Sequence, residues 1–515
     1  MRMRGLEPPR ARAHGDLNAA RLPIPPHPRA GEGHSSASAS EIRVGWRSVP
    51  LLPGVAIVGL VVLVGVRYAF RQDAWLALVA GREIWQHGIP HHDALTSLAA
   101  GREWIDQQWL AQLTLYALDK LGGLALVALA YAALVVGSLT AAIVLGGRLG
   151  ASARAQAWSF LPCAFLVLLA PVRTQPLAYP LFVAVVYLLA RDSRGRGSSR
   201  DIYLTLVVLA FWANVHGSAA LGAVLVVLRG VTLLLGAANG GRARGAVLTV
   251  GGPLCLLLTP YGLDTATYYR ETLFRHDFTR LVSEWRPVTS AAVTAIPFFI
   301  LLGGTVLSLY RNSRRLTAWE LIAVAVLFAS AASALRNVVW LALGLLLLPA
   351  LELPRRGARS RGEGLRRALL VTTCVATVAF AVLTMTRDDR YFEVGHSQRA
   401  LEVVLTQARR DPQIRIFADE RYADWLLWRA PSLQRRIAFD VRFELLSRSE
   451  LDAIADTLKG SGDHWQRGAR GSRVVVLSPN ERPDSARRFL AEPGRRILLR
   501  DSDAVVVLRP TEAAS

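Results

Sequence analysis

The sequence predicts a polytopic α-helical membrane protein with a small α/β domain at its C-terminal end. Of the 515 residues, 52% are hydrophobic and only 19% are charged, which is too apolar for a water-soluble chain of this size. Apolar runs recur from about residue 51 to residue 385, and the chain then turns polar. Both features are typical of a bundle of lipid-facing helices followed by a soluble domain.

Eleven apolar runs are candidates for membrane-spanning helices, because a helix needs about 20 apolar residues to cross the hydrocarbon core. Together they predict a membrane domain over residues 49–385, with long outer loops at 67–122 and 260–290. The runs lie near residues 51–66, 123–147, 157–171, 177–190, 203–215, 217–236, 246–259, 291–310, 317–334, 337–352 and 368–385.

The segment 1–48 is rich in Pro, Ala, Ser and Arg and has no apolar periodicity. Such a composition does not form a core, so we expect a disordered, basic N-terminal segment. A cleaved signal peptide is the poorer interpretation. The first apolar run begins only near Leu51, and neither a small-residue cleavage site nor a mature soluble domain follows it.

The arginines predict the orientation of the bundle. With a cytoplasmic N-terminus, every inside loop is basic and nearly free of acid, as the positive-inside rule requires. We therefore expect a multi-pass protein of the bacterial inner membrane with residues 386–515 outside. The net charge of +21 is dispersed over these loops, which argues against a nucleic-acid partner. The inside loops carry Arg148 and Arg154; Arg191, Arg194, Arg196 and Arg200; Arg242 and Arg244; Arg311, Arg314 and Arg315; and the arginines of residues 355–367.

Polar residues gather at the predicted outer ends of the spans. Asp73 follows the first span and is either a functional carboxylate or a solvated loop acid. Arg336 has no acid near it in sequence, so it needs a carboxylate brought in by the fold or a bound anion such as a lipid phosphate. Snorkelling to lipid headgroups is the alternative for Arg336, and more strongly for Arg173. Further polar residues at these ends are Gln175, Asn214, His216 and Asn337.

The two outer loops add aromatic and acidic residues. Trp285 beside Glu284 is either a residue of the interfacial aromatic belt or a platform for a sugar ring. The run His91, His92, Asp93 resembles a metal cluster, although adjacent residues rarely ligate one ion. A divalent metal is therefore possible, but no cofactor is certain. The three cysteines all lie in apolar runs and make no metal site.

Several classes of protein are disfavoured by missing motifs. The sequence has no Walker loop, dinucleotide fingerprint, zinc-protease helix or Gly-x-Ser-x-Gly elbow. Ion-coupled transporters normally carry acidic relay residues at mid-membrane depth. No Asp, Glu or Lys lies near the middle of a predicted span, so ion-coupled transport is disfavoured. Any chemistry is therefore expected at the outer face.

The motifs resemble those of the GT-C superfamily of polyprenyl-phosphate-sugar-dependent glycosyltransferases, and more narrowly those of a group of bacterial membrane proteins placed near the protein mannosyltransferases. The resemblance covers roughly residues 50–345. It is carried by Asp73-x-Trp75, Gly81, Gly88-x-Pro90, Asp93, Trp104, Asp106 and Trp109, then by Trp212-x-Asn214-x-His216-Gly217, Pro260-Tyr261-Gly262, Glu284-Trp285 and Arg336-Asn337.

The resemblance implies a polyprenyl-phosphate-linked sugar donor, a glycan, lipid or protein acceptor reaching the site from outside, and an inverting displacement. Asp73 would be the general base. Many such enzymes place a second acid beside this one, whereas here the neighbours are Gln72 and Ala74, so Asp93 or Asp106 would be the substitute. The implied substrate-binding residues are Trp104, Trp109, Arg173, Gln175, Asn214, His216, Tyr261, Glu284, Trp285, Arg336 and Asn337.

The C-terminal part, residues 386–515, predicts a small α/β domain outside the cytoplasm. The runs IRIFAD, RRIAFDV, SRVVVL and AVVVLR read as strands, and amphipathic stretches separate them. Trp425, Trp428, Asp440 and Arg442 either hold an acceptor or are packing and salt-bridge residues. We favour packing.

Two other functions remain open on the sequence: a non-catalytic envelope assembly protein and a transporter of lipid-linked glycans. An enzyme needs Asp73 and Arg336 in one cavity, whereas a scaffold does not. A transporter needs a polar route between the leaflets.

The predicted orientation is testable with reporter fusions. Alkaline phosphatase should be inactive when fused after residue 200 and active when fused after residue 400. The reverse pattern would contradict the assignment.

Overall fold

The computed structural model describes residues 51–236, 241–274, 282–312, 315–351 and 363–510. The predicted N-terminal segment 1–48 lies outside these residues, as do Arg314 and most of the arginine-rich stretch 355–367. Each of the eleven predicted apolar runs falls on an α-helix. The division into a membrane domain and a C-terminal domain at residue 385 stays a prediction, because residues 49–515 form one compact unit.

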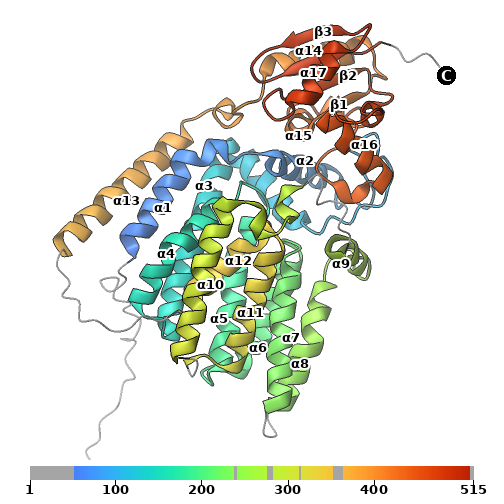
Figure 1. The fold of residues 1–515 in the computed structure, drawn as a ribbon. Helices are drawn as coiled ribbons and strands as arrows, with labels where there is room; N and C mark the ends of the chain where they lie inside the picture. Colours follow the sequence, from blue (N-terminus) through green and yellow to red (C-terminus); the bar gives the residue numbers. More distant parts are fainter. Residues whose placement is uncertain (1–50, 237–240, 275–281, 313–314, 352–362, 511–515) are drawn as a thin grey trace, which may run out of the picture. The chain divides into compact units, whose positions relative to one another are not determined.

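The helices and strands are shown in Figure 1. In chain order they are α1 (Leu52–Gly65), α2 (Gln72–His87), α3 (Trp109–Leu149), α4 (Ala153–Leu168), α5 (Tyr179–Ser193), α6 (Ser199–Ala213), α7 (Ala219–Gly236), α8 (Gly241–Leu256), α9 (Asp264–Phe274), α10 (Ala292–Asn312), α11 (Ala318–Ser333), α12 (Val338–Leu347), α13 (Glu363–Met385), α14 (Gln398–Arg410), β1 (Ile416–Ala418), α15 (Glu420–Arg429), α16 (Arg448–Lys459), β2 (Val474–Leu477), α17 (Pro483–Ala491), β3 (Arg496–Arg500) and β4 (Val505–Leu508).

The bundle is organised around α12, all of whose residues are buried. It packs against α3, α4, α5 and α11. By contrast, α13 packs on α1 and leaves apolar residues such as Val371, Val375 and Val378 exposed. Such a surface suits contact with lipid. By length and composition, four of the described helices are able to cross a membrane: α3, α7, α10 and α13. The count of eleven spans stays a prediction.

A break in α3 separates an outer-loop helix from a predicted span. Gly122 and Gly123 leave the helical conformation, and Gly123 has a φ of +65°, which favours glycine. The Asp389 carboxylate accepts a hydrogen bond from the Leu124 backbone N–H at 3.1 Å and so caps the second half of the helix. The predicted start of this span at residue 123 coincides with the break.

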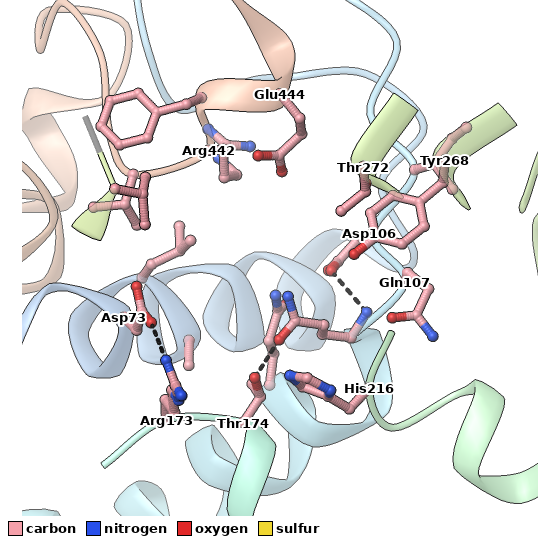
Figure 2. Close-up of a pocket in the computed structure, with 18 of the residues that line it drawn as sticks. Asp73, Asp106, Gln107, Arg173, Thr174, His216, Tyr268, Thr272, Arg442 and Glu444 are labelled. Carbon is pink, nitrogen blue, oxygen red and sulfur yellow. Dashed lines mark hydrogen bonds and ion pairs between the residues drawn. The ribbon is translucent and has the colours of Figure 1, made fainter. Parts of the chain in front are cut away.

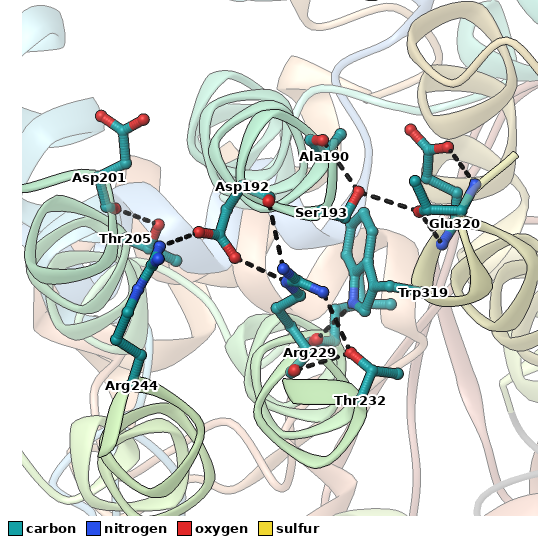
Figure 3. A network of polar contacts seen from close by, with 12 residues as sticks. Ala190, Asp192, Ser193, Asp201, Thr205, Arg229, Thr232, Arg244, Trp319 and Glu320 are labelled. Atoms are coloured by element: carbon teal, nitrogen blue, oxygen red, sulfur yellow. Dashed lines mark hydrogen bonds and ion pairs between the residues drawn. The ribbon is translucent and has the colours of Figure 1, made fainter. Parts of the chain in front are cut away.

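Ion pairs join the ends of several helices around Asp192 and Glu320 (Figure 3). Asp192, at the end of α5, pairs with Arg229 of α7 at 2.7 Å and also with Arg244 of α8. Arg194 pairs with Glu320 of α11 at 2.7 Å and donates to the Leu149 carbonyl at the end of α3. Loops assigned to one side by their arginines therefore meet at one end of the bundle. That this end faces the cytoplasm stays a prediction.

A four-stranded sheet forms in the C-terminal part, in the order β1-β2-β4-β3. β1 and β2 are parallel, and β4 is antiparallel to both β2 and β3. Three of the predicted strand-like runs form β1, β2 and β4. The edge strand β3 was not predicted.

The prediction of a strand at RRIAFDV was wrong, because this run makes only an isolated bridge between Ile437 and Ile416. Its backbone instead pairs with the first outer loop. Arg435 N–H donates to the Leu95 carbonyl at 2.8 Å, and Ser97 N–H donates to the Ile437 carbonyl at 2.8 Å. The run therefore attaches the C-terminal part to the outer loop.

Helix α2 is held between α3 and α15. A Cβ atom at Gly81 would lie 2.2 Å from the Gln112 carbonyl oxygen, so glycine permits the close approach of α2 to α3. On the other face, Arg82 donates to the Leu427 and Trp428 carbonyls at the end of α15, at 2.7 and 2.8 Å. Trp75 is fully buried, with its ring centroid 4.8 Å from that of Trp428. These contacts place Asp73, in the first turn of α2, at a defined position.

Candidate active site

A cavity of about 150 Å³ lies where the outer loops meet the C-terminal part (Figure 2). It contains nine of the residues singled out in the sequence. These are Asp73, Trp104, Asp106, Arg173, His216, Glu284, Trp285, Arg336 and Arg442.

Arg173 brings two carboxylates together. Its side chain is only 7% exposed, and it forms ion pairs with Glu284 and, at 3.5 Å, with Asp73. Its other terminal nitrogen donates to the Gln175 side chain. A buried guanidinium with these partners is not a snorkelling side chain, so the alternative considered for Arg173 was wrong. Glu284 is the second acid that the local sequence around Asp73 lacks.

The surroundings shift the pKa values of Asp73 and Glu284 in opposite directions. Burial raises the pKa of Asp73, and the negative charge of Glu284 raises it further against the opposing charges of Arg173 and Arg336. Burial also acts on Glu284, but Arg173 and Arg336 hold its pKa below the ordinary value. Of these two carboxylates, Asp73 is therefore the more readily protonated.

Arg336 occupies the same cavity with fewer partners. Its guanidinium lies over the Trp285 ring, 4.7 Å from the centroid. The Gln175 amide donates to the Arg336 carbonyl at 3.0 Å and so holds its backbone. Among the described residues, no carboxylate forms an ion pair with this guanidinium. An anion entering the cavity would therefore meet a pre-positioned positive charge.

Polar residues also line the other end of the cavity. Asp106 is 3% exposed, and burial raises its pKa to about 7. Burial likewise raises the pKa of Glu444 to about 7. Burial and the charges of Arg336 and Arg173 hold the pKa of His216 well below its ordinary value, so this imidazole is neutral at pH 7.

Asp93 does not line the cavity. Its carboxylate accepts from Arg442 at 2.5 Å and from Thr96 Oγ1 at 2.8 Å. Although burial opposes ionisation, Arg442 and these hydrogen bonds hold the pKa of Asp93 below its ordinary value. Arg442 also pairs with Asp440 and lies over Trp104 at 4.2 Å. Asp93 thus clamps the outer loop to the C-terminal part rather than substituting for Asp73.

The remaining predicted residues support the cavity from outside. The Trp109 indole donates to the Asn214 side chain at 3.0 Å, and Asn214 in turn donates to the Leu258 carbonyl at 2.8 Å. Tyr261 donates to the Pro90 carbonyl at 2.8 Å. Asn337 donates to the Ser330 carbonyl at 3.1 Å. Gln175 contacts Arg173 and Arg336 as described above. These side chains hold loops in place.

The possible metal cluster is not assembled. Within the described part of the chain, no three His, Cys, Asp or Glu residues are grouped to hold an ion. The His91 ring instead packs edge-on against Tyr261, with centroids 5.4 Å apart.

Several lining residues were not predicted as site residues. Gln107, Gln108 and Gln112 lie beside Asp106 in the first outer loop and in α3, where the Trp-x-Asp motif already pointed. Glu444 has no distinguishing local signal. Trp425, Trp428 and Asp440 are packing or ion-pair residues, as expected, whereas Arg442 both forms ion pairs and lines the cavity.

Solved structures share this fold. The archaeal oligosaccharyltransferase AglB from Archaeoglobus fulgidus, in complex with an inhibitory peptide and a dolichol-phosphate, superimposes with a TM-score of 0.52 over 84% of this chain and 70% of its own, at 12% identity. ArnT from Cupriavidus metallidurans bound to undecaprenyl phosphate gives 0.48 over 89% and 98%, at 15% identity. No protein-family model and no curated protein matches the sequence. The likeness to AglB shows that the chain has the GT-C fold, as its motifs implied.

The clamp between the outer loop and the C-terminal part is testable by removing Asp93. Asp93→Ala leaves the buried Arg442 with one carboxylate fewer, and breaking such a pair typically costs about 3–5 kcal/mol. The thermal unfolding midpoint in detergent should fall well below that of Asp463→Ala, which removes an exposed acid. An unchanged midpoint would remove the clamp from this account.

Proposed function

We propose that this protein is a glycosyltransferase that moves a sugar from a polyprenyl-phosphate-linked donor to an acceptor at the extracytoplasmic face, with inversion. One observation carries the proposal: Asp73 and Arg336 line the same cavity, together with the Arg173–Glu284 pair. The GT-C fold supports it, since AglB, which has this fold, is an oligosaccharyltransferase.

The residues divide the reaction between them. Asp73 takes the proton of the acceptor hydroxyl as its oxygen attacks the anomeric carbon. The bond from that carbon to the phosphate oxygen breaks, and its electron pair leaves with the lipid phosphate. Arg336 stabilises the departing phosphate. The negative charge of Glu284 offsets the positive charge of Arg173, so the pKa of Asp73 stays high enough for it to accept a proton.

The cavity favours this reaction over the two alternative functions. A scaffold has no need for a half-exposed carboxylate in the same cavity as a guanidinium that has no ion-pair partner among the described residues. A transporter needs a polar route between the leaflets, whereas the cavity residues come from outer loops and helix ends. At the opposite end of the bundle, the charges of Asp192, Arg194 and Glu320 are neutralised in ion pairs.

The role of Asp73 predicts a loss of rate without a loss of fold. Asp73→Asn keeps the size of the side chain but removes the base, and general-base catalysis typically contributes 10²- to 10⁴-fold. Sugar transfer by purified protein should fall by about that factor, while the unfolding midpoint stays near that of Asp463→Asn. Wild-type transfer by Asp73→Asn would reject Asp73 as the base.

The role of Arg336 predicts graded effects on donor binding. Lysine keeps the charge but loses the planar pair of donors that suits phosphate oxygens, so Arg336→Lys should weaken binding partly and Arg336→Ala severely. The control is Arg387→Lys, an exposed arginine whose guanidinium lies 5.0 Å from the centroid of the Tyr391 ring. Binding of polyprenyl phosphate and membrane abundance should be measured together.

The snorkelling alternative makes a different prediction for these variants. Lysine would then substitute fully, and alanine would lower abundance rather than affinity. Unchanged binding in Arg336→Ala would end the proposal for this residue.

A further inference from the structure

The end of the cavity beyond Arg336 contains buried hydrogen-bond acceptors without partners. Asp106 Oδ2, Gln107 Oε1 and Gln112 Oε1 are fully buried, and within the described structure none of these three atoms has a hydrogen-bond partner of normal geometry, although the Gln112 side chain lies close enough to Asp106 to lower its pKa. The three residues are 2–3% exposed and all line the cavity. Because leaving such groups unpaired is costly, a set of three indicates a ligand that supplies the donors.

The orientation of the Gln107 side-chain amide shows which of its atoms faces the cavity. Its amide nitrogen donates to the Ala213 carbonyl at 2.6 Å. A carbonyl can only accept, so the nitrogen is fixed there and the Gln107 oxygen must face the cavity as an acceptor. Asp106 is also oriented, since one of its oxygens accepts from the Gln108 backbone N–H at 3.3 Å. Figure 2 shows Asp106 and Gln107 grouped with Tyr268, away from the Asp73–Arg173 pair.

Gly217 lies beside Gln107 and Tyr268, two residues that line this end of the cavity. A Cβ atom at Gly217 would lie 3.0 Å from the Tyr268 hydroxyl and 3.1 Å from Gln107 Oε1. Both contacts are tight for a methyl group, so a side chain at this position would intrude where the unpaired oxygen points. Glycine here keeps the space open.

The charged residues at this end of the cavity favour a ligand with hydroxyl groups over one with a carboxylate. Asp106 and Glu444 are both acids, and the guanidinium of Arg442 is already paired with Asp440 and Asp93. Above about pH 7, where Asp106 and Glu444 are ionised, a further carboxylate would be repelled at this end of the cavity, whereas hydroxyl groups would donate to the three unpaired oxygens.

The space also lies next to Arg336. The charge of Arg336 lowers the pKa of Glu444 and of Tyr268, against a larger and opposite effect of burial. It also lowers the pKa of His216, in the same direction as burial does. A phosphate held by Arg336 would therefore carry its sugar into this space.

We propose that Asp106, Gln107 and Gln112, with Gly217 leaving room beside the Gln107 oxygen, form a subsite for the hydroxyl groups of an uncharged sugar, the one attached to the lipid phosphate. This proposal rests on the proposed function, which it extends to the class of sugar. It predicts a neutral glycose and disfavours a uronic acid.

The test compares five probes on the full-length protein in detergent: polyprenyl phosphate alone, the same lipid carrying a neutral hexose, the lipid carrying a hexuronic acid, a free hexose, and a neutral oligosaccharide as acceptor. The wild type should bind the hexose form most tightly. Gly217→Ala and Asp106→Asn should each weaken hexose-lipid binding about tenfold, the value of a lost hydrogen bond of about 1.4 kcal/mol. Both should leave the affinity for bare polyprenyl phosphate unchanged.

Stability separates this role from a structural one. The pKa of Asp106 is raised by burial from 3.8 to about 7, so the folded state keeps a proton that the unfolded state loses between these pH values. The contribution of Asp106 to the free energy of unfolding therefore becomes less favourable as pH rises from about 4 to about 7. Asp106→Asn should raise the unfolding midpoint at pH 8 relative to the wild type and change it little near pH 4. A fall at pH 8 would make Asp106 a structural residue and contradict the proposal.

The remaining outcomes are also distinct. If both variants lose affinity only for a neutral oligosaccharide added as acceptor, the subsite holds the acceptor sugar instead. If all affinities stay at wild-type values, or if the uronic acid binds best, the subsite is rejected. If the wild type fails to bind bare polyprenyl phosphate but binds hexose in a Gly217-dependent manner, the proposed function fails and the subsite stands.

Discussion

A buried guanidinium is the constraint on which the candidate site depends. Arg173 sits between α4 and α5 and is almost fully removed from water. An isolated charge in such a place is strongly disfavoured, so the fold must bring carboxylates to it. It brings Asp73 from the start of α2 and Glu284 from the second outer loop. One ion-pair cluster therefore sets the relative positions of three segments that are far apart in the chain.

The same cluster gives the carboxyl groups of Asp73 and Glu284 different pKa values. Glu284 takes the closer contact with Arg173 and is held as an anion. Its charge, together with burial, then works against ionisation of Asp73. A scaffold of aromatic and polar contacts keeps this arrangement in place, above all the packing of Trp75 on Trp428 and the capping of α15 by Arg82. Asp93 and Arg442 close the cavity from the C-terminal side.

The sequence predicts the helices well and the site in part, for identifiable physical reasons. Lipid-facing helices are continuous apolar runs, so all eleven runs fall on helices, and the Gly122–Gly123 break was visible as the start of one of them. Asp73 and Arg336 stand out because polar residues at helix ends are unusual. The partnership of Arg173 with Glu284 joins residues 111 positions apart, and that of Asp93 with Arg442 joins residues 349 positions apart. Local patterns do not encode such pairs, and Glu444 has no local signal at all.

The central claim is that Glu284, through its charge and its hold on Arg173, keeps the pKa of Asp73 raised. The most direct measurement is the pH dependence of kcat/KM for sugar transfer by the wild type and by Glu284→Gln. Removing the negative charge of Glu284, and freeing Arg173 to act on Asp73 alone, both favour the ionised form of Asp73. The acid limb of the profile should therefore move to lower pH in Glu284→Gln. An acid limb that stays in place, or that moves to higher pH, would contradict the account.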